Sequence, residues 1–189
     1  MAKFKVEIEG TSDYLQNKMV MATKEEQKAK SKLTGSVKGQ EAIDMHYEEK
    51  VYRAEDGSCY IPSTHLEGAM IKAATEYIIP GKGKKTWKDI FKGLVICTEN
   101  KIQFSPKKKN PDEKYEAITR NPATGGRNVT IRPLYAAGWK AEFEIDCLDE
   151  AIDSDLLAEI LGRAGQYKGI GDYRPKFGRF QVNKVVLVK

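Results

Sequence analysis

The chain has 189 residues, of which 40% are hydrophobic and 31% charged, enough for one domain that buries roughly 70% of its unfolded surface without disulfides or metal. No run approaches the roughly 20 apolar residues of a membrane span, and no apolar leader follows Met1, so a cytoplasmic protein that contacts no membrane is expected. The net charge of +5 is too small by itself to indicate a polyanionic partner.

The first part of the chain is expected to form a strand, a polar insertion and a hairpin. Between residues 3 and 9, apolar and charged residues alternate, which is the period of a strand with one buried face. Residues from about 22 to 44 are nearly all polar, which indicates an exposed insertion. Residues 45–53 and 59–61 flank the turn-forming segment 55–58, so a hairpin is expected there.

A helix and two short strands are expected next. Thr64 followed by Glu67 is the pattern of a capping box, and apolar residues at spacings of three and four continue until Pro80-Gly81 ends the helix. Five lysines against one acid follow between Lys82 and Lys92. Two apolar stretches between residues 94 and 104 predict strands.

The remainder begins with a second insertion. Residues 105–128 are rich in Lys, Asn, Pro and Gly and are longer than a passive loop in a compact domain. Strands are expected at 129–135 and at 139–146, where apolar and charged residues alternate most regularly. A helix capped by Asp153 follows, and a strand at 180–188 comes last.

Without its insertions, the order of elements is strand, helix, strand, strand, helix, strand. This order predicts an α+β fold of the ferredoxin-like or RRM-like kind, in which two helices cover one face of an antiparallel sheet. Residues 1–189 would then form a single domain with long loop insertions at about 22–44 and 105–128. The open sheet face, or the loops at its edge, would be available to a ligand.

Three cysteines lie far apart in the sequence, at Cys59, Cys97 and Cys147. Their odd number and wide spacing fit neither a disulfide framework nor a CxxC metal site. They are expected to be buried free thiols, and neither a metal nor another cofactor is expected.

Charge is segregated along the chain. Residues 105–132 carry seven basic residues against three acidic ones, and residues 163–189 carry seven against one. Between them, residues 133–162 carry one basic residue against eight acidic ones. Two basic blocks that fold against each other would form a phosphate-binding stripe, and the acidic block could meet a basic face on a neighbouring copy.

Glycines, basic residues and aromatic residues gather between the last helix and the last strand. Four glycines, at positions 165, 169, 171 and 178, allow this loop to approach another backbone or a phosphate chain closely. The aromatic side chains could stack on bases. A dinucleotide-binding glycine motif requires the order strand, loop, helix, whereas this loop runs from a helix to a strand.

The segment Gly169–Phe180 has the form G-x-G-x-x-R-P-x-x-G-x-F and resembles the loop near the end of proteins of the RAMP superfamily of CRISPR-associated proteins. The stretch Tyr60–Ala69 resembles the segment that opens the first helix in these proteins, and Glu9–Leu15 is similar to the loop after their first strand. Residues 139–146 fall where a core strand of the family belongs. The nearest match is the repeated backbone subunit, which has an RRM-like core, or a RAMP-like protein of a phage or mobile element.

The resemblance implies a non-catalytic protein that binds a single strand of RNA, or else of DNA. It would assemble along that strand as a backbone-type subunit, with its own copies or with other subunits of a nucleoprotein complex. Long insertions in the family act as a thumb that pins the strand, a role that residues 105–128 would take here. The expected nucleic-acid-binding residues are Lys107, Lys108, Lys109, Arg120, Arg127, Lys168, Gly169, Gly171, Tyr173, Arg174, Lys176 and Arg179.

Two alternative functions are compatible with the sequence. Some RAMP relatives cleave RNA, so the chain could be a metal-independent RNA endonuclease. His46 and His65, the two histidines of the chain, are then the candidates for general acid and base. The second alternative is an adaptor of RAMP-like fold that binds protein and no nucleic acid.

Overall fold

A four-stranded antiparallel sheet forms the body of the protein. The computed structural model describes residues 1–19, 47–120, 125 and 127–188, so the insertion predicted at about 22–44 lies outside the described residues. The strands follow one another across the sheet in the order β4-β8-β1-β9. They are β1 (Ala2–Gly10), β4 (Val95–Cys97), β8 (Lys140–Cys147) and β9 (Phe180–Val188). All four strand predictions are confirmed, because alternating or apolar runs bury one side of each strand.

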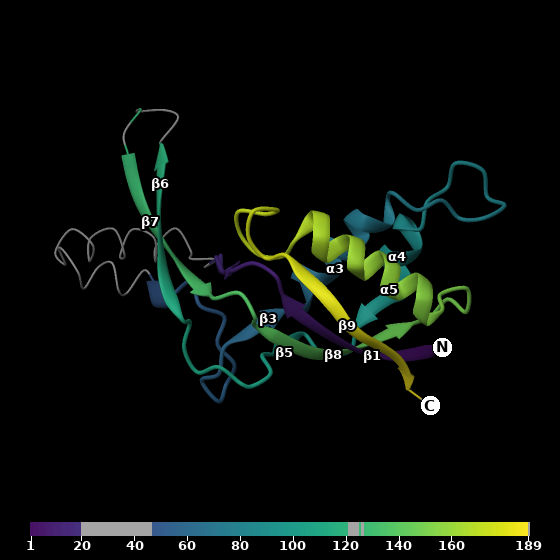
Figure 1. Ribbon diagram of the computed structural model, residues 1–189, viewed down its shortest axis with the longest axis horizontal. Coiled ribbons are helices and arrows are strands. Elements are labelled where there is room, and N and C mark those ends of the chain that lie inside the picture. Colours follow the sequence, from purple (N-terminus) through teal and green to yellow (C-terminus); the bar gives the residue numbers. More distant parts are fainter. Residues whose placement is uncertain (20–46, 121–124, 126, 189) are drawn as a thin grey trace, which may run out of the picture.

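Three helices lie on one side of this sheet (Figure 1). They are α3 (Ser63–Ala74), α4 (Lys88–Leu94) and α5 (Ser154–Arg163), and a π-helical turn, Ala164–Lys168, extends α5. The two predicted helices are confirmed as α3 and α5, and α4 is a third helix among the described residues that was not predicted. The helix α4 has only seven residues, too short to give a periodic signal among its lysines.

The caps of the two longer helices differ in how well the sequence predicts them. Asp153 caps α5 as predicted, since its Oδ1 accepts a hydrogen bond from Leu156 N–H at 2.8 Å. The capping box predicted for α3 is wrong, because its N-cap is Pro62, which makes no side-chain bond. Glu67 instead accepts a hydrogen bond from the N–H of Cys97 in β4 at 3.1 Å. The carboxylate of Glu67, which the local pattern assigns to the helix cap, therefore makes a tertiary contact with β4.

The predicted end of α3 is also wrong, because the helix ends at Ala74 rather than at Pro80. The residues after it turn back on themselves: Ile79 N–H donates to Lys85 O at 2.9 Å, and Trp87 N–H donates to Tyr77 O at 3.0 Å. Backbone pairing within this turn replaces the last helical turn.

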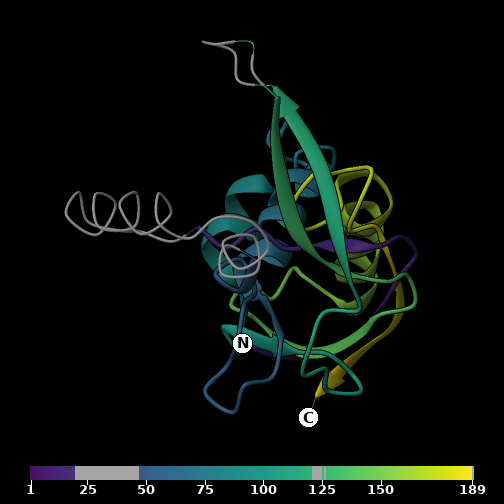
Figure 2. The same ribbon diagram turned by 90° about the vertical axis from the view of Figure 1, so that its left-hand side faces the viewer.

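A two-stranded arm projects from the body (Figures 1 and 2). It consists of β6 (Glu113–Arg120) and β7 (Arg127–Tyr135), which pair antiparallel along their whole length. The loop predicted for residues 105–128 is thus wrong over β6. Its few apolar residues alternate over too short a stretch, between charged residues, to indicate a strand. At its foot, β7 also pairs with β2 (Tyr14–Leu15), and β3 (Tyr60–Pro62) pairs with β5 (Lys101–Gln103) nearby.

The core lies between the sheet and the helices. The side chains of Trp139 and Phe143 are buried, and Trp87 is buried in the same core. The three cysteines are buried and free, as predicted. Within the described ranges, no helix combines the length and apolar character needed to cross a bilayer.

Candidate nucleic-acid interface

The glycine-rich loop, residues 165–178, is held against the segment that follows β1. Gly178 N–H donates to Asp13 O at 2.7 Å, and Asp172 N–H donates to Leu15 O at 2.9 Å. Within the loop, Ile170 N–H donates to Gly178 O at 2.9 Å. These bonds fix the loop beside β2, and therefore beside the foot of the arm.

The glycines of the loop allow these close approaches. A Cβ atom on Gly171 would lie 2.3 Å from Leu15 O, and one on Gly169 would lie 2.8 Å from Phe177 O. Both glycines also have a positive φ, which a residue with a side chain adopts only at a cost. The predicted binding residues Gly169 and Gly171 thus make close contacts with protein backbone in this structure.

An aromatic cluster joins the loop to the arm. The ring of Tyr115 in β6 meets the ring of Phe177 edge-on, with centroids 5.1 Å apart, and the ring of Tyr173 at 6.3 Å. Tyr173 is 38% exposed and has a φ of 52°, a left-handed conformation that costs a tyrosine about 1 kcal/mol or more. The surrounding bonds hold Tyr173 in this conformation, at the foot of the arm.

An ion pair provides a second link between the arm and the loop. Arg132 Nε in β7 lies 2.8 Å from Asp172 Oδ2. Lys50 Nζ donates a hydrogen bond to Ile131 O at 2.9 Å, and burial together with the positive charge of Arg132 lowers the pKa of Lys50. Two basic side chains, Lys50 and Arg132, therefore lie where the arm meets the body, and Asp172 neutralises one of the two charges.

Three basic side chains from the end of the loop and the residue after it lie in the same region. Arg174 and Lys176 are exposed, and neither forms an ion pair with any residue that the structure describes. Lys176 Nζ lies 5.4 Å from the centroid of the Phe177 ring, and Arg179 Nε donates to Pro175 O at 2.8 Å. Because the first two carry no internal counter-charge among the described residues, they are available to an external anion.

His65, at the start of α3, lies beside this loop. Its Nδ1 is 2.9 Å from the hydroxyl of Tyr14, which can donate to a neutral imidazole. Its ring also meets that of Tyr52, which in turn meets that of Tyr60, each with centroids 5.6 Å apart. Tyr52 and Tyr60 lie on the predicted hairpin, which is confirmed by the bridge between Arg53 and Cys59.

The stability of the protein is expected to fall as the pH drops from about 6.5 to about 4. Burial, and secondly Arg174, lower the pKa of His65 to about 4, whereas the unfolded chain has a pKa near 6.5. Between these values only the unfolded state binds the proton, which costs roughly 3 kcal/mol across the window. Urea unfolding at several pH values should show this loss. It should be smaller in His65→Asn, and equal losses in both proteins would contradict the prediction.

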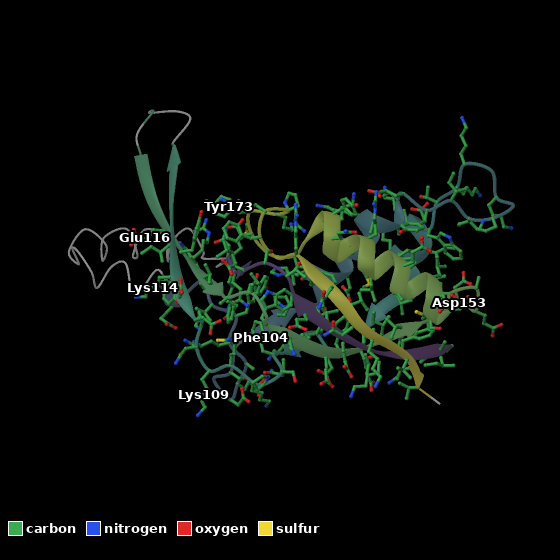
Figure 3. All side chains as sticks on the ribbon, viewed as in Figure 1. Phe104, Lys109, Lys114, Glu116, Asp153 and Tyr173 are labelled. Carbon is green, nitrogen blue, oxygen red and sulfur yellow. The ribbon has the colours of Figure 1, made fainter. Side chains whose placement is uncertain are left out.

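The lysines predicted at the start of the second insertion lie elsewhere. Lys107 forms an ion pair with Asp56 at 3.2 Å, and Lys108 with Asp112 at 2.6 Å. Figure 3 shows Lys109 and Tyr173 on opposite sides of the foot of the arm. The structure therefore does not bring these lysines together with the glycine-rich loop.

Three further predicted residues lie apart from the loop tip. Lys168 forms an ion pair with Glu76, and it shares this carboxylate with Arg163, whose Nε lies 2.6 Å from it. Arg120 and Arg127 face each other in the backbone register near the end of the arm, and their side chains lie outside the described part of the chain, as does the whole of His46.

The outer face of the sheet has a different character. Lys5 on β1 pairs with Glu142 on β8 at 3.0 Å, and Lys3 pairs with Glu144 at 3.2 Å. Opposite charges thus face each other in three of the four outward pairs of β1 and β8, and Glu7 lies opposite Glu142 in the fourth. The outward positions of these two strands hold no aromatic residue. The exposed aromatic side chain of Tyr173 lies on the glycine-rich loop and not on this face.

Sequence reasoning missed several members of this region. Tyr115, Arg132 and Lys50 come from segments that are distant in the sequence, and only the pairing of β7 with β2 brings them to the loop. The contact between Tyr52 and Tyr60 could have been predicted, since these aromatic residues lie on the two sides of one predicted turn. In the described ranges, His, Cys, Asp and Glu do not form any group of three that could hold a metal ion.

Comparison with known proteins gives a structural match only. No family model and no curated protein matches the sequence. The fold is similar to that of a chain in the cryo-EM structure of the Type III-B Cmr-beta bound to cognate target RNA, with a TM-score of 0.61 and 12% sequence identity. The match covers all of this chain and 61% of the other, so this chain spans about three fifths of that chain's length.

Proposed function

We propose that this chain is a non-catalytic, single-stranded RNA-binding protein of the RAMP superfamily of CRISPR-associated proteins. The observation that carries the proposal is the meeting of three segments: the foot of the arm, the glycine-rich loop and the start of α3. The exposed side chains of Tyr173, Arg174 and Lys176 all belong to the glycine-rich loop, and the loop holds them beside Tyr115 of the arm and His65 of α3. Aromatic rings for stacking beside unpaired basic groups are the two elements that a single-strand site needs.

The topology supports this proposal. In chain order, β1, β4, β8 and β9 take the places of the first to fourth strands of a ferredoxin-like or RRM-like sheet, with α3 and α5 as its two crossover helices. The likeness to a chain of an RNA-bound Cmr-beta structure agrees with the RAMP motifs in the sequence. We take residues 1–189 as a single cytoplasmic RAMP-like domain in which β6 of the arm belongs to the second insertion.

The arm is the proposed thumb. It stands beside the binding region and extends away from the body (Figure 2), so a strand lying on the loop would also contact the foot of the arm. Copies of the chain, or other subunits of a nucleoprotein complex, would follow one another along the RNA.

Binding of labelled single-stranded RNA of about 20 nucleotides, a length above the site size of one small domain, tests the proposal by fluorescence anisotropy. With about three phosphate contacts, the affinity should fall roughly 20-fold between about 50 mM and about 200 mM salt. Duplex RNA should bind more weakly, because its stacked bases are not open to aromatic side chains. Single-stranded DNA of the same sequence measures the preference for RNA.

Three results of this experiment would contradict the proposal. No binding at low salt would favour the protein-binding adaptor, and tighter binding to DNA would change the ligand. Shortening of the RNA in the presence of EDTA, lost in a variant with both His46→Ala and His65→Ala, would show the metal-independent endonuclease instead.

A further inference from the structure

One edge of the sheet is left unpaired over a long strand. The outermost strand, β9, pairs with β1 from Gly10 to Lys3 on one side. Within the described residues, no other strand pairs with it. The opposite edge strand, β4, has only three residues. Proteins commonly protect sheet edges by making them short or charged, and β9 differs in having nine residues.

The second half of β9 has the composition of an interior strand. Its residues Val185–Val188 are apolar on both faces of the sheet, a pattern that is typical of strands with neighbours on both sides. The side chains of Val186, Leu187 and Val188 are 42%, 51% and 40% exposed. The first half of β9 is protected against pairing with another strand, because it contains a bulge opposite Glu7/Ile8 and the charged side chain of Lys184.

A groove lies between this strand and α5. Its volume is about 660 Å³, and its lining runs from Phe180 to Val185 on β9. On α5 the lining includes Ser154, Ala158 and Gly162, which are spaced four residues apart and so lie along one side of the helix. Their short side chains leave room for the helix-side residues of an added strand.

We propose that β9 pairs with β9 of a second copy of this chain, antiparallel, about a two-fold axis at Val186. Residues directly opposite each other in an antiparallel pair point to the same face of the sheet. If the helices of both copies lie on the same side of the joined sheet, the two-fold axis is perpendicular to the sheet. One residue of β9 must then lie directly opposite the same residue of the partner subunit. An axis at Val186 sets Val185 opposite Leu187 of the partner subunit, and Lys184 opposite Val188 of the partner subunit.

A second copy fits this edge because the strand complements itself. Within Val185–Val188, each apolar residue then meets an apolar residue or the partner's lysine stem, and no like charges oppose each other. An axis at Lys184 would extend the pairing but would place two lysines opposite each other, which is unfavourable. The charge pattern thus excludes an axis at Lys184. An axis at Val185 would set Leu187 opposite the polar Asn183 of the partner subunit, so the register centred on Val186 matches the apolar residues better.

The contact leaves the proposed nucleic-acid interface free. The end of β9 that carries Val188 lies at the opposite end of the molecule from the arm (Figure 1). Two copies joined there would both keep their glycine-rich loops and arms accessible. The dimer therefore neither requires RNA nor blocks it, and it can be tested independently of the proposed function.

Sedimentation velocity of the full chain without nucleic acid tests this pairing from about 5 µM to about 200 µM, a range that covers the micromolar dissociation constants of short interfaces. The wild type should shift from monomer to dimer across this range. Val186→Lys should remain monomeric, because it sets two lysines opposite each other on the axis. Its exposed position keeps the substitution out of the core. Ile96→Lys is the matched control, since Ile96 is 48% exposed on the other edge strand, and it should dimerise like the wild type.

Three outcomes would overturn the pairing: a wild type that stays monomeric at the highest concentration, a Val186→Lys variant that still dimerises, or equal dissociation of both variants. Amide hydrogen exchange gives a second readout, because the amides of residues 185–188 that point away from β1 should exchange more slowly as the wild-type concentration rises. Failure of RNA binding with the dimer intact would refute the proposed function alone.

Discussion

Gly178→Ala is expected to lower the free energy of unfolding by about 3 kcal/mol or more. Gly178 has a φ of 73°, and a Cβ atom there would lie 1.8 Å from Ile170 O, a backbone atom that cannot move aside alone. The same residue donates a hydrogen bond to Asp13 O and accepts one from Ile170 N–H. The substitution would therefore separate the loop from the segment after β1, and urea unfolding followed by tryptophan fluorescence measures the loss.

Gly68→Ala is the control for this prediction. Gly68 lies inside α3 and has no positive φ, and a Cβ atom added there would meet none of the described residues within 4 Å beyond its own helix backbone and chain neighbours. Alanine there should raise the free energy of unfolding by about 0.5–1 kcal/mol, because it reduces the freedom of the unfolded chain. If Gly178→Ala proved as stable as the wild type, the loop would not be fixed by close backbone contact.

Replacing Arg174 and Lys176 together with alanine is expected to weaken single-stranded RNA binding about 30-fold, or about 2 kcal/mol. Both side chains are exposed and form no ion pair with a described residue, so their removal costs the folded protein little. Loss of two phosphate contacts should also make the slope of log affinity against log salt shallower by about 1.4. Anisotropy titrations at several salt concentrations give both quantities.

The double variant Lys84→Ala, Lys85→Ala is the matched control. It removes the same charge from the exposed turn between α3 and α4, which lies at the opposite end of the molecule from the arm (Figure 1). RNA affinity should fall less than about 3-fold, the change expected from net charge alone. Equal weakening by both variants would show that RNA binding depends on overall charge and not on the glycine-rich loop.

Local patterns predicted the elements of the body because the forces that form them are local in sequence. The alternation in β1 and β8 and the cap at Asp153 each depend on residues a few positions apart. Predictions failed where a distant partner changed the outcome. Glu67 turns to the amide of Cys97 in place of its own helix start, and β6 gains its stability from pairing with β7.

The candidate site was predictable only in part for the same reason. The loop was recognisable because its glycines, basic residues and aromatic residues are consecutive. Its neighbours were not, since Tyr115, Arg132 and His65 reach it from three separate segments. The sequence also could not distinguish paired lysines such as Lys168 from unpaired ones such as Lys176, because an ion pair depends on which carboxylate lies nearby.

The sequence by itself determined the strands of the sheet, the two longer helices, the buried cysteines and the composition of the glycine-rich loop. Each of these depends on a repeat or on neighbouring residue types, which the chain carries in its order. Only the tertiary structure decided that the loop lies at the foot of an arm, that the outer sheet face is covered by ion pairs, and that β9 has an edge unpaired by any described strand. Those features depend on which distant segments pair, and strand pairing is settled by the packing of the whole core.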